Sequence, residues 1–186
     1  MNLPNSLTIS RIFLTILFIF VVFYEGIFFK SLALGIFLLA SLTDYLDGYW
    51  TRQKGEITSF GRLMDPIADK LLTQSAFIVF VLMGLVPVWM ALIIITRDVW
   101  ITGQRLLMPA ESLVVGARKS GKYKTAFQLA VIIGILIYLV LREMPFWQAD
   151  RDTVARQIIV INMYLVVAIT LWSGVLYIVK NKKLFH

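Results

Sequence analysis

The chain has 186 residues, 59% of them hydrophobic, and its 18 Lys and Arg against 11 Asp and Glu give a formal charge of +7. Soluble domains average about 45–50% apolar residues, so this composition excludes an ordinary soluble protein and predicts one membrane domain over residues 1–186. The absence of cysteine excludes a disulfide and a zinc-thiolate site, and a single histidine, His186, at the last position argues against a Ser-His-Asp triad. The positive charge is typical of membrane topology and does not call for nucleic acid as a partner.

Apolar runs of about the length needed to cross a bilayer as a helix follow one another along the chain. A short interfacial helix is expected first, starting near Pro4, Asn5 and Thr8. The sequence therefore predicts an all-α, polytopic membrane protein with six transmembrane helices. The spans are predicted near residues 11–28, 31–51, 66–84, 87–107, 122–141 and 153–179, with turns at 84–87 and 142–152.

Basic residues gather in alternate connections between these spans. Cytoplasmic loops of membrane proteins are rich in Lys and Arg, so we expect both termini and these connections on the cytoplasmic side. The basic residues are Arg52, Lys54 and Arg62, then Arg105, Arg118, Lys119, Lys122 and Lys124, and finally Lys180, Lys182 and Lys183.

Four aspartates interrupt the apolar pattern between the second and third predicted spans. Asp44 and Asp47 are three residues apart and Asp65 and Asp69 are four apart, so each pair shares one face of a helix. A charge at the centre of a membrane helix costs about 2.5–3.5 kcal/mol, so these carboxylates need compensation. The connection is short enough for the pairs to face each other, and oxygen donors without His or Cys suit Mg²⁺, Mn²⁺ or Ca²⁺. We therefore expect one or two divalent cations.

Two glycines and an arginine accompany the aspartates. Gly48 and Gly61 permit close approach of another helix or a ligand, and Arg52 could hold a phosphate or pair with an aspartate. The structural alternative makes Asp65 an N-cap, followed by Pro66 at the first helical position.

The spacing D-x2-D-G-x2-T-R-x8-G-x3-D-x3-D, from Asp44 to Asp69, resembles the signature of the CDP-alcohol phosphotransferase family. That signature usually has alanine where this chain has Thr51, and every other motif position matches. The resemblance implies a dimeric membrane fold of six helices. It also implies a reaction in which a CDP-alcohol such as CDP-diacylglycerol gives its phosphate-linked alcohol to an acceptor hydroxyl and releases CMP.

The same resemblance assigns roles to the motif residues. It implies two divalent cations, Mg²⁺ or Mn²⁺, bound by Asp44, Asp47, Asp65 and Asp69, with Asp69 also the candidate general base. It further implies a CDP site lined by Gly48, Arg52 and Gly61.

Further segments extend the resemblance to one bacterial branch of the family, in which the acceptor is glycerol 3-phosphate. They are NLPNSLTISR near the N-terminus, TRDVWITGQR at 96–105, GKYKT at 121–125, and WSG with Tyr177 near the C-terminus. This branch implies a bacterial cell membrane location, with the active site facing the cytoplasm.

The fourth predicted span carries a polar stripe, which also points to a site for the acceptor. Asp98, Thr102 and Arg105 follow i, i+4, i+7 spacing, and a polar stripe in a span should face the protein interior or a water-filled cavity. Arg97 beside Asp98 could form an intramembrane ion pair that fixes packing, or act in catalysis. The candidates for binding the acceptor phosphate are Arg105, Lys122, Lys124 and Arg118, and ordinary topology is the alternative reason for such basic residues.

Other functions remain open at this stage. Within the family, the chain could form phosphatidylserine, phosphatidylinositol phosphate or cardiolipin, because the shared motif handles only the donor and the metal. Outside it, the aspartates could belong to a divalent-cation transporter, although transport predicts acids spread along a path through several spans. A non-catalytic membrane scaffold would leave the cost of the carboxylates unexplained.

Overall fold

The structure is a computed structural model that describes residues 3–54, 59–107 and 115–180, with side chains at 9–43, 67, 68, 70–104, 106 and 121–180. Six α-helices and no strand occur within those backbone ranges, which confirms the prediction of an all-α fold. The helices are α1 Leu3–Val21, α2 Ile27–Lys54, α3 Ser59–Leu82, α4 Val88–Leu107, α5 Val115–Arg142 and α6 Ala149–Lys180.

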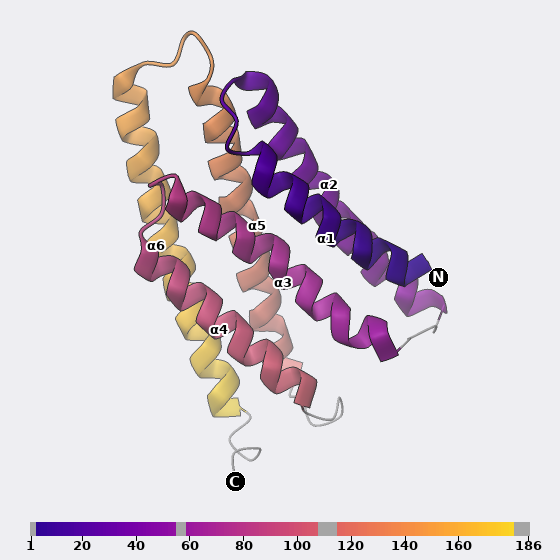
Figure 1. The fold of residues 1–186 in the computed structure, drawn as a ribbon. Helices are drawn as coiled ribbons and strands as arrows, with labels where there is room; N and C mark the ends of the chain where they lie inside the picture. Colours follow the sequence, from indigo (N-terminus) through magenta and orange to yellow (C-terminus); the bar gives the residue numbers. More distant parts are fainter. Residues whose placement is uncertain (1–2, 55–58, 108–114, 181–186) are drawn as a thin grey trace.

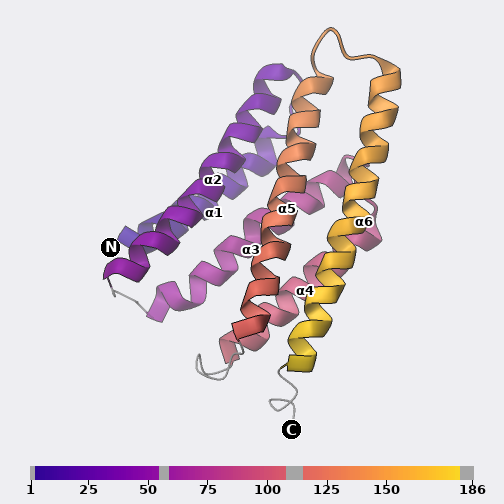
Figure 2. The ribbon, with the colours of Figure 1, turned by 180° about the vertical axis from the view of Figure 1, so that it is seen from behind.

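Consecutive helices run in opposite directions across one bundle. The α1–α2, α3–α4 and α5–α6 turns lie on one side of the bundle, while the start of α1 and the end of α6 lie on the other (Figures 1 and 2). The end of α2, the start of α3, the end of α4 and the start of α5 share that second side. The chain segments that carry the predicted site are therefore gathered at one side of the bundle.

The core is formed where α1 packs on α2 and α3, α5 packs on α2 and α6, and α4 packs on α3 and α6. Phe18 of α1 and Phe37 of α2 lie with ring centroids 5.6 Å apart, a distance favoured by aromatic pairs. Large side chains from the other helices complete the core, among them Phe77, Phe80, Met90, Ile132 and Met163.

The outer faces of the bundle are apolar as well. Each helix exposes large hydrophobic side chains, for example Phe13, Phe28, Leu82, Val99, Ile137 and Trp172. Helices that are apolar all round are typical of a membrane environment, because exposing so much apolar surface to water is unfavourable in free energy. Among the described side chains, the stretches Gly121–Arg142 and Ala149–Lys180 are long and apolar enough to cross a membrane. These features fit a membrane protein.

The N-terminal part of the fold differs from the prediction. A separate interfacial helix was expected before the first span, but α1 is one uninterrupted helix from Leu3 to Val21. The first turn also comes earlier than expected, because Gly26 has a φ of +101°, a left-handed conformation that glycine adopts without strain. Apolar residues flank Glu25 and Gly26 closely on both sides, so hydropathy alone did not place the turn there.

The other connections follow the sequence more closely. Gly84, with a φ of +69°, ends α3 within the predicted 84–87 turn, and the predicted 142–152 turn corresponds to the segment between α5 and α6. The start of α3 shows a further difference. Asp65 lies inside a helix that begins at Ser59, so the interpretation of Asp65 as an N-cap is wrong.

A polar clamp fastens the α1–α2 turn to the end of α5. The backbone N–H of Gly26 donates to the Glu143 carboxylate at 3.0 Å, and the buried Lys30 ammonium donates to the backbone oxygen of Val22 at 2.8 Å. These bonds satisfy backbone groups at a helix end, which otherwise lack partners. The clamp therefore stabilises this side of the bundle.

We expect Glu143→Ala to lower the free energy of unfolding by about 1–2 kcal/mol, because the part-buried Gly26 N–H loses its acceptor. Thermal unfolding in detergent would measure the change. Asp150→Ala is the matched control, since Asp150 is exposed and its side chain makes no hydrogen bond within the described part of the chain. Equal unfolding temperatures for the two variants would contradict the role of the clamp.

Candidate active site

The end of α2 and the start of α3 carry every motif position. Asp44, Asp47, Gly48 and Arg52 lie in the last turns of α2, and Gly61, Asp65 and Asp69 lie in the first turns of α3. The helical backbone confirms that the two aspartates of each pair are about one turn apart on the same helix. The side chains of these seven residues lie outside the described part, so the metal, base and CDP roles stay predictions.

Neighbouring side chains show which face of α3 is interior. Ala68, Leu72 and Thr73 are buried, whereas Ile67 and Leu71 are exposed. With 3.6 residues per turn, positions 65 and 69 fall on the interior side of the helix.

The same reasoning applies to α2. Ala33, Phe37 and Ala40 are buried, whereas Leu38 and Leu42 are exposed. Positions 44, 47 and 48 continue the buried series by helical spacing, and α2 contacts α3. Positions 44, 47, 48, 65 and 69 therefore lie on the helix faces turned toward the rest of the bundle.

The donor set of the motif suits a divalent cation. Four carboxylates on two adjacent helix ends provide only hard oxygen ligands, which Mg²⁺ and Mn²⁺ prefer. Elsewhere in the described side chains, no three acidic or histidine residues come together as a metal site. The motif is thus the place in this chain to test for metal.

A buried ionic cluster joins α4, α5 and α6 in the interior. The Lys124 ammonium donates a hydrogen bond to the Asp98 carboxylate, and the Arg97 guanidinium donates to the same carboxylate oxygen at 3.1 Å. Arg97 also donates to the Ser173 hydroxyl at 2.9 Å. Asp98 is 2% exposed and Lys124 is 1% exposed. The sequence analysis offered an ion pair between Arg97 and Asp98 as one alternative. It did not predict that Lys124 and Ser173 would contact this pair.

The four acceptor-phosphate candidates fall in different surroundings. Lys122 is exposed, and Lys124 is buried against Asp98. Arg105 and Arg118 lie in α4 and α5, with side chains outside the described part. Asp98, the first member of the predicted polar stripe, does face the interior. The structure therefore brings only Lys124 of this set into a described polar cluster.

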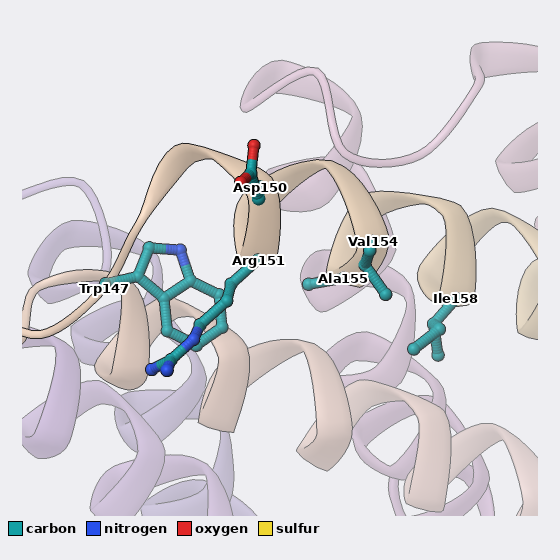
Figure 3. A pocket seen from close by; sticks show the side chains of 6 residues that line it. All are labelled: Trp147, Asp150, Arg151, Val154, Ala155 and Ile158. Atoms are coloured by element: carbon teal, nitrogen blue, oxygen red, sulfur yellow. The ribbon is translucent and has the colours of Figure 1, made fainter.

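A hollow on the bundle surface lies away from the motif. It has a volume of about 390 Å³ and is lined by Trp147, Asp150, Arg151, Val154, Ala155 and Ile158. Figure 3 shows Arg151 extending beside Trp147 at the start of α6. Because α6 begins on the side of the bundle opposite to the end of α2, this hollow is not part of the candidate site.

Comparison with known proteins decides the family. The family model described as CDP-alcohol phosphatidyltransferase matches residues 1–179, nearly the whole chain and all of the motif. The chain belongs to the CDP-alcohol phosphatidyltransferase family. This membership confirms the resemblance carried by the aspartate spacing.

Several similar proteins have names that state a reaction or its product. A Bacillus subtilis protein named CDP-diacylglycerol–glycerol-3-phosphate 3-phosphatidyltransferase is 34% identical over 97% of this chain and 95% of its own length. A Rickettsia typhi protein of the same name is 33% identical over 82% of this chain and 91% of its own length. A Mycobacterium tuberculosis protein named probable phosphatidylglycerophosphate synthase is 38% identical over 73% of this chain and 66% of its own length.

Proposed function

We propose that this protein transfers the phosphatidyl group of CDP-diacylglycerol to glycerol 3-phosphate, giving phosphatidylglycerophosphate and CMP. It would then be a phosphatidylglycerophosphate synthase of phospholipid biosynthesis. The observation that carries the proposal is the match over 97% of the chain to a relative named for this reaction, with the motif intact on α2 and α3. Family membership favours a transferase over the cation transporter and the scaffold.

The proposed setting is the bacterial cell membrane, crossed by all six helices, with both termini and the active site on the cytoplasmic side. The alternating direction of the helices supports this topology. So does the gathering of Lys and Arg at the ends of α2 and α4 and the starts of α3 and α5, since cytoplasmic connections favour basic residues. A water-soluble acceptor could then reach a donor that stays in the lipid. The protein is proposed to act as a homodimer.

Asp44, Asp47, Asp65 and Asp69 would hold two divalent cations, Mg²⁺ or Mn²⁺. Cations bound there would neutralise the pyrophosphate of the donor and the charge that develops on departing CMP. Gly48 and Gly61, which lack side chains, would let the nucleotide approach the helix backbones, and Arg52 would bind a donor phosphate.

The transfer itself needs a base and a fixed acceptor. Asp69 would accept the proton of the acceptor hydroxyl. The oxygen of that hydroxyl would form a bond to the lipid-linked phosphorus, and the bond between this phosphorus and CMP would break. Arg105, Lys122, Lys124 and Arg118 would bind the acceptor phosphate and thereby orient the hydroxyl. The proposed donor residues therefore belong to α2 and α3, and the proposed acceptor residues belong to α4 and α5.

A CMP-release assay tests the proposal on purified protein in detergent with CDP-diacylglycerol and Mg²⁺ or Mn²⁺. Glycerol 3-phosphate, serine, inositol phosphate and phosphatidylglycerol are supplied in separate reactions. We expect release with glycerol 3-phosphate alone. Release only with another acceptor would keep the family chemistry and overturn the acceptor, and no release from folded protein with any of them would overturn the proposed function.

A further inference from the structure

Counted over the described side chains alone, the buried cluster of α4, α5 and α6 has more positive than negative charge. Lys124 and Arg97 both contact one carboxylate, that of Asp98, so the three groups together carry a net positive charge. Ionised groups lose much of their hydration when they are buried, and removing one partner of such a pair is strongly destabilising. Asp98 therefore compensates the charge of the Lys124 ammonium in the interior.

Within the described part of the chain, the cluster also has more hydrogen-bond donors than acceptors. An ammonium has three N–H donors, and within the described part of the chain Lys124 makes one hydrogen bond, to Asp98. One turn further along the buried face of α5, the Gln128 amide nitrogen has no partner among the described residues, although Gln128 is 1% exposed. Buried polar groups are normally satisfied, so unused donors beside excess positive charge favour an anionic, oxygen-rich ligand.

The position of the cluster connects the two sides of the candidate site. Lys70 follows Asp69 on α3, and α3 contacts α5, the helix of Lys124. Asp98 lies on α4 two helical turns before Arg105. The Lys124 ammonium is thus held between the helix of the proposed base and the helix of an acceptor candidate.

We propose that Asp98 is a positioning residue, which holds the Lys124 ammonium inside the bundle to meet the phosphate of the acceptor. This inference rests on the proposed function. Without the carboxylate, the flexible four-carbon side chain of Lys124 carries its charge toward water or loses its proton. Acceptor binding then weakens, while the donor side on α2 and α3 is unaffected.

Asp98→Asn tests this role because it removes the charge with little change of volume. We expect the KM for glycerol 3-phosphate to rise by about tenfold or more, corresponding to about 1.4 kcal/mol, with the KM for CDP-diacylglycerol nearly unchanged. Direct calorimetric binding of glycerol 3-phosphate should weaken by a similar factor. The amount of folded protein is measured by size exclusion and thermal unfolding.

Asp152→Asn is the matched control. Asp152 also binds an arginine, Arg156, at 2.8 Å, and accepts a hydrogen bond from the Tyr138 hydroxyl at 2.6 Å, but it lies in the first turn of α6. The start of α6 is on the side of the bundle opposite to the end of α2 (Figure 1). This variant should lose stability without a change in either KM. A purely structural role for Asp98 would give the same result in both variants.

If the single variant does not fold, the double variant Asp98→Asn with Lys124→Met tests whether the pair serves the acceptor, because it removes both members of the pair. Its acceptor KM should be raised and its donor KM retained. A wild-type acceptor KM in either folded Asp98 variant, or an equal rise in both KM values, overturns the positioning role. If the wild-type protein still releases CMP with glycerol 3-phosphate, either of these results overturns the positioning role alone and leaves the proposed function intact. If the wild-type protein does not release CMP with glycerol 3-phosphate, both the proposed function and the positioning role are overturned.

Discussion

Asp69→Asn is expected to lower kcat for CMP release by about 10²–10⁴-fold, because an amide cannot accept the proton of the acceptor hydroxyl. Asparagine has nearly the same volume as aspartate and keeps one oxygen that can bind a cation. Position 69 lies well inside α3 rather than at its end, so the helix should form normally. The loss should therefore fall on kcat, with a smaller change in the KM for CDP-diacylglycerol.

The measurement is CMP release per folded protein, with helical content followed by circular dichroism. Asp150→Asn serves as the control, because Asp150 is an exposed aspartate at the start of α6, on the opposite side of the bundle from the motif. It should turn over like the wild type. Wild-type turnover in folded Asp69→Asn would show that another residue is the base.

Removal of divalent cations is expected to bring CMP release down to background, and addition of Mg²⁺ or Mn²⁺ should restore it. The donor pyrophosphate and the four carboxylates would otherwise place several negative charges together without compensation. The test is an assay with a chelator, followed by titration with each cation. Activity that is insensitive to a chelator would rule out the proposed metal role of the motif.

Single aspartate variants test whether the requirement for divalent cations arises at the motif. Asp44→Asn should raise the cation concentration for half-maximal activity by more than about tenfold, since even groups that only support metal ligands change affinity by about 10–100-fold. Asp152→Asn, which removes a carboxylate at the other side of the bundle, should leave the cation requirement unchanged. An equal shift in both variants would point to a general effect of charge.

Hydropathy and motif spacing were informative about different parts of the molecule. Apolar runs predicted the six helices and the turn at Gly84, because a helix in an apolar environment satisfies its own backbone hydrogen bonds. They were less informative about helix ends. The predicted third span began at 66, whereas α3 begins at Ser59, since helical hydrogen bonding continues into polar sequence that hydropathy does not recognise as helix.

Motif spacing identified the family because its residues are close in sequence and lie on two consecutive helices. Asp44 to Asp69 spans one helix end, one connection and one helix start, so local periodicity was enough to pair the aspartates. The acceptor candidates were harder to place. Basic residues near helix ends serve topology as well as binding, and the sequence does not distinguish the two uses.

The sequence by itself determined the helical membrane fold, the family and the residues proposed for metal and nucleotide, because those depend on neighbouring positions. Only the tertiary structure showed that Lys124 is held by Asp98, 26 residues away, and Arg97 by Ser173, 76 residues away. It alone showed Glu143 against Gly26, 117 residues away. Such pairings depend on which helix faces pack together, and the pattern within one helix does not specify the face of its neighbour.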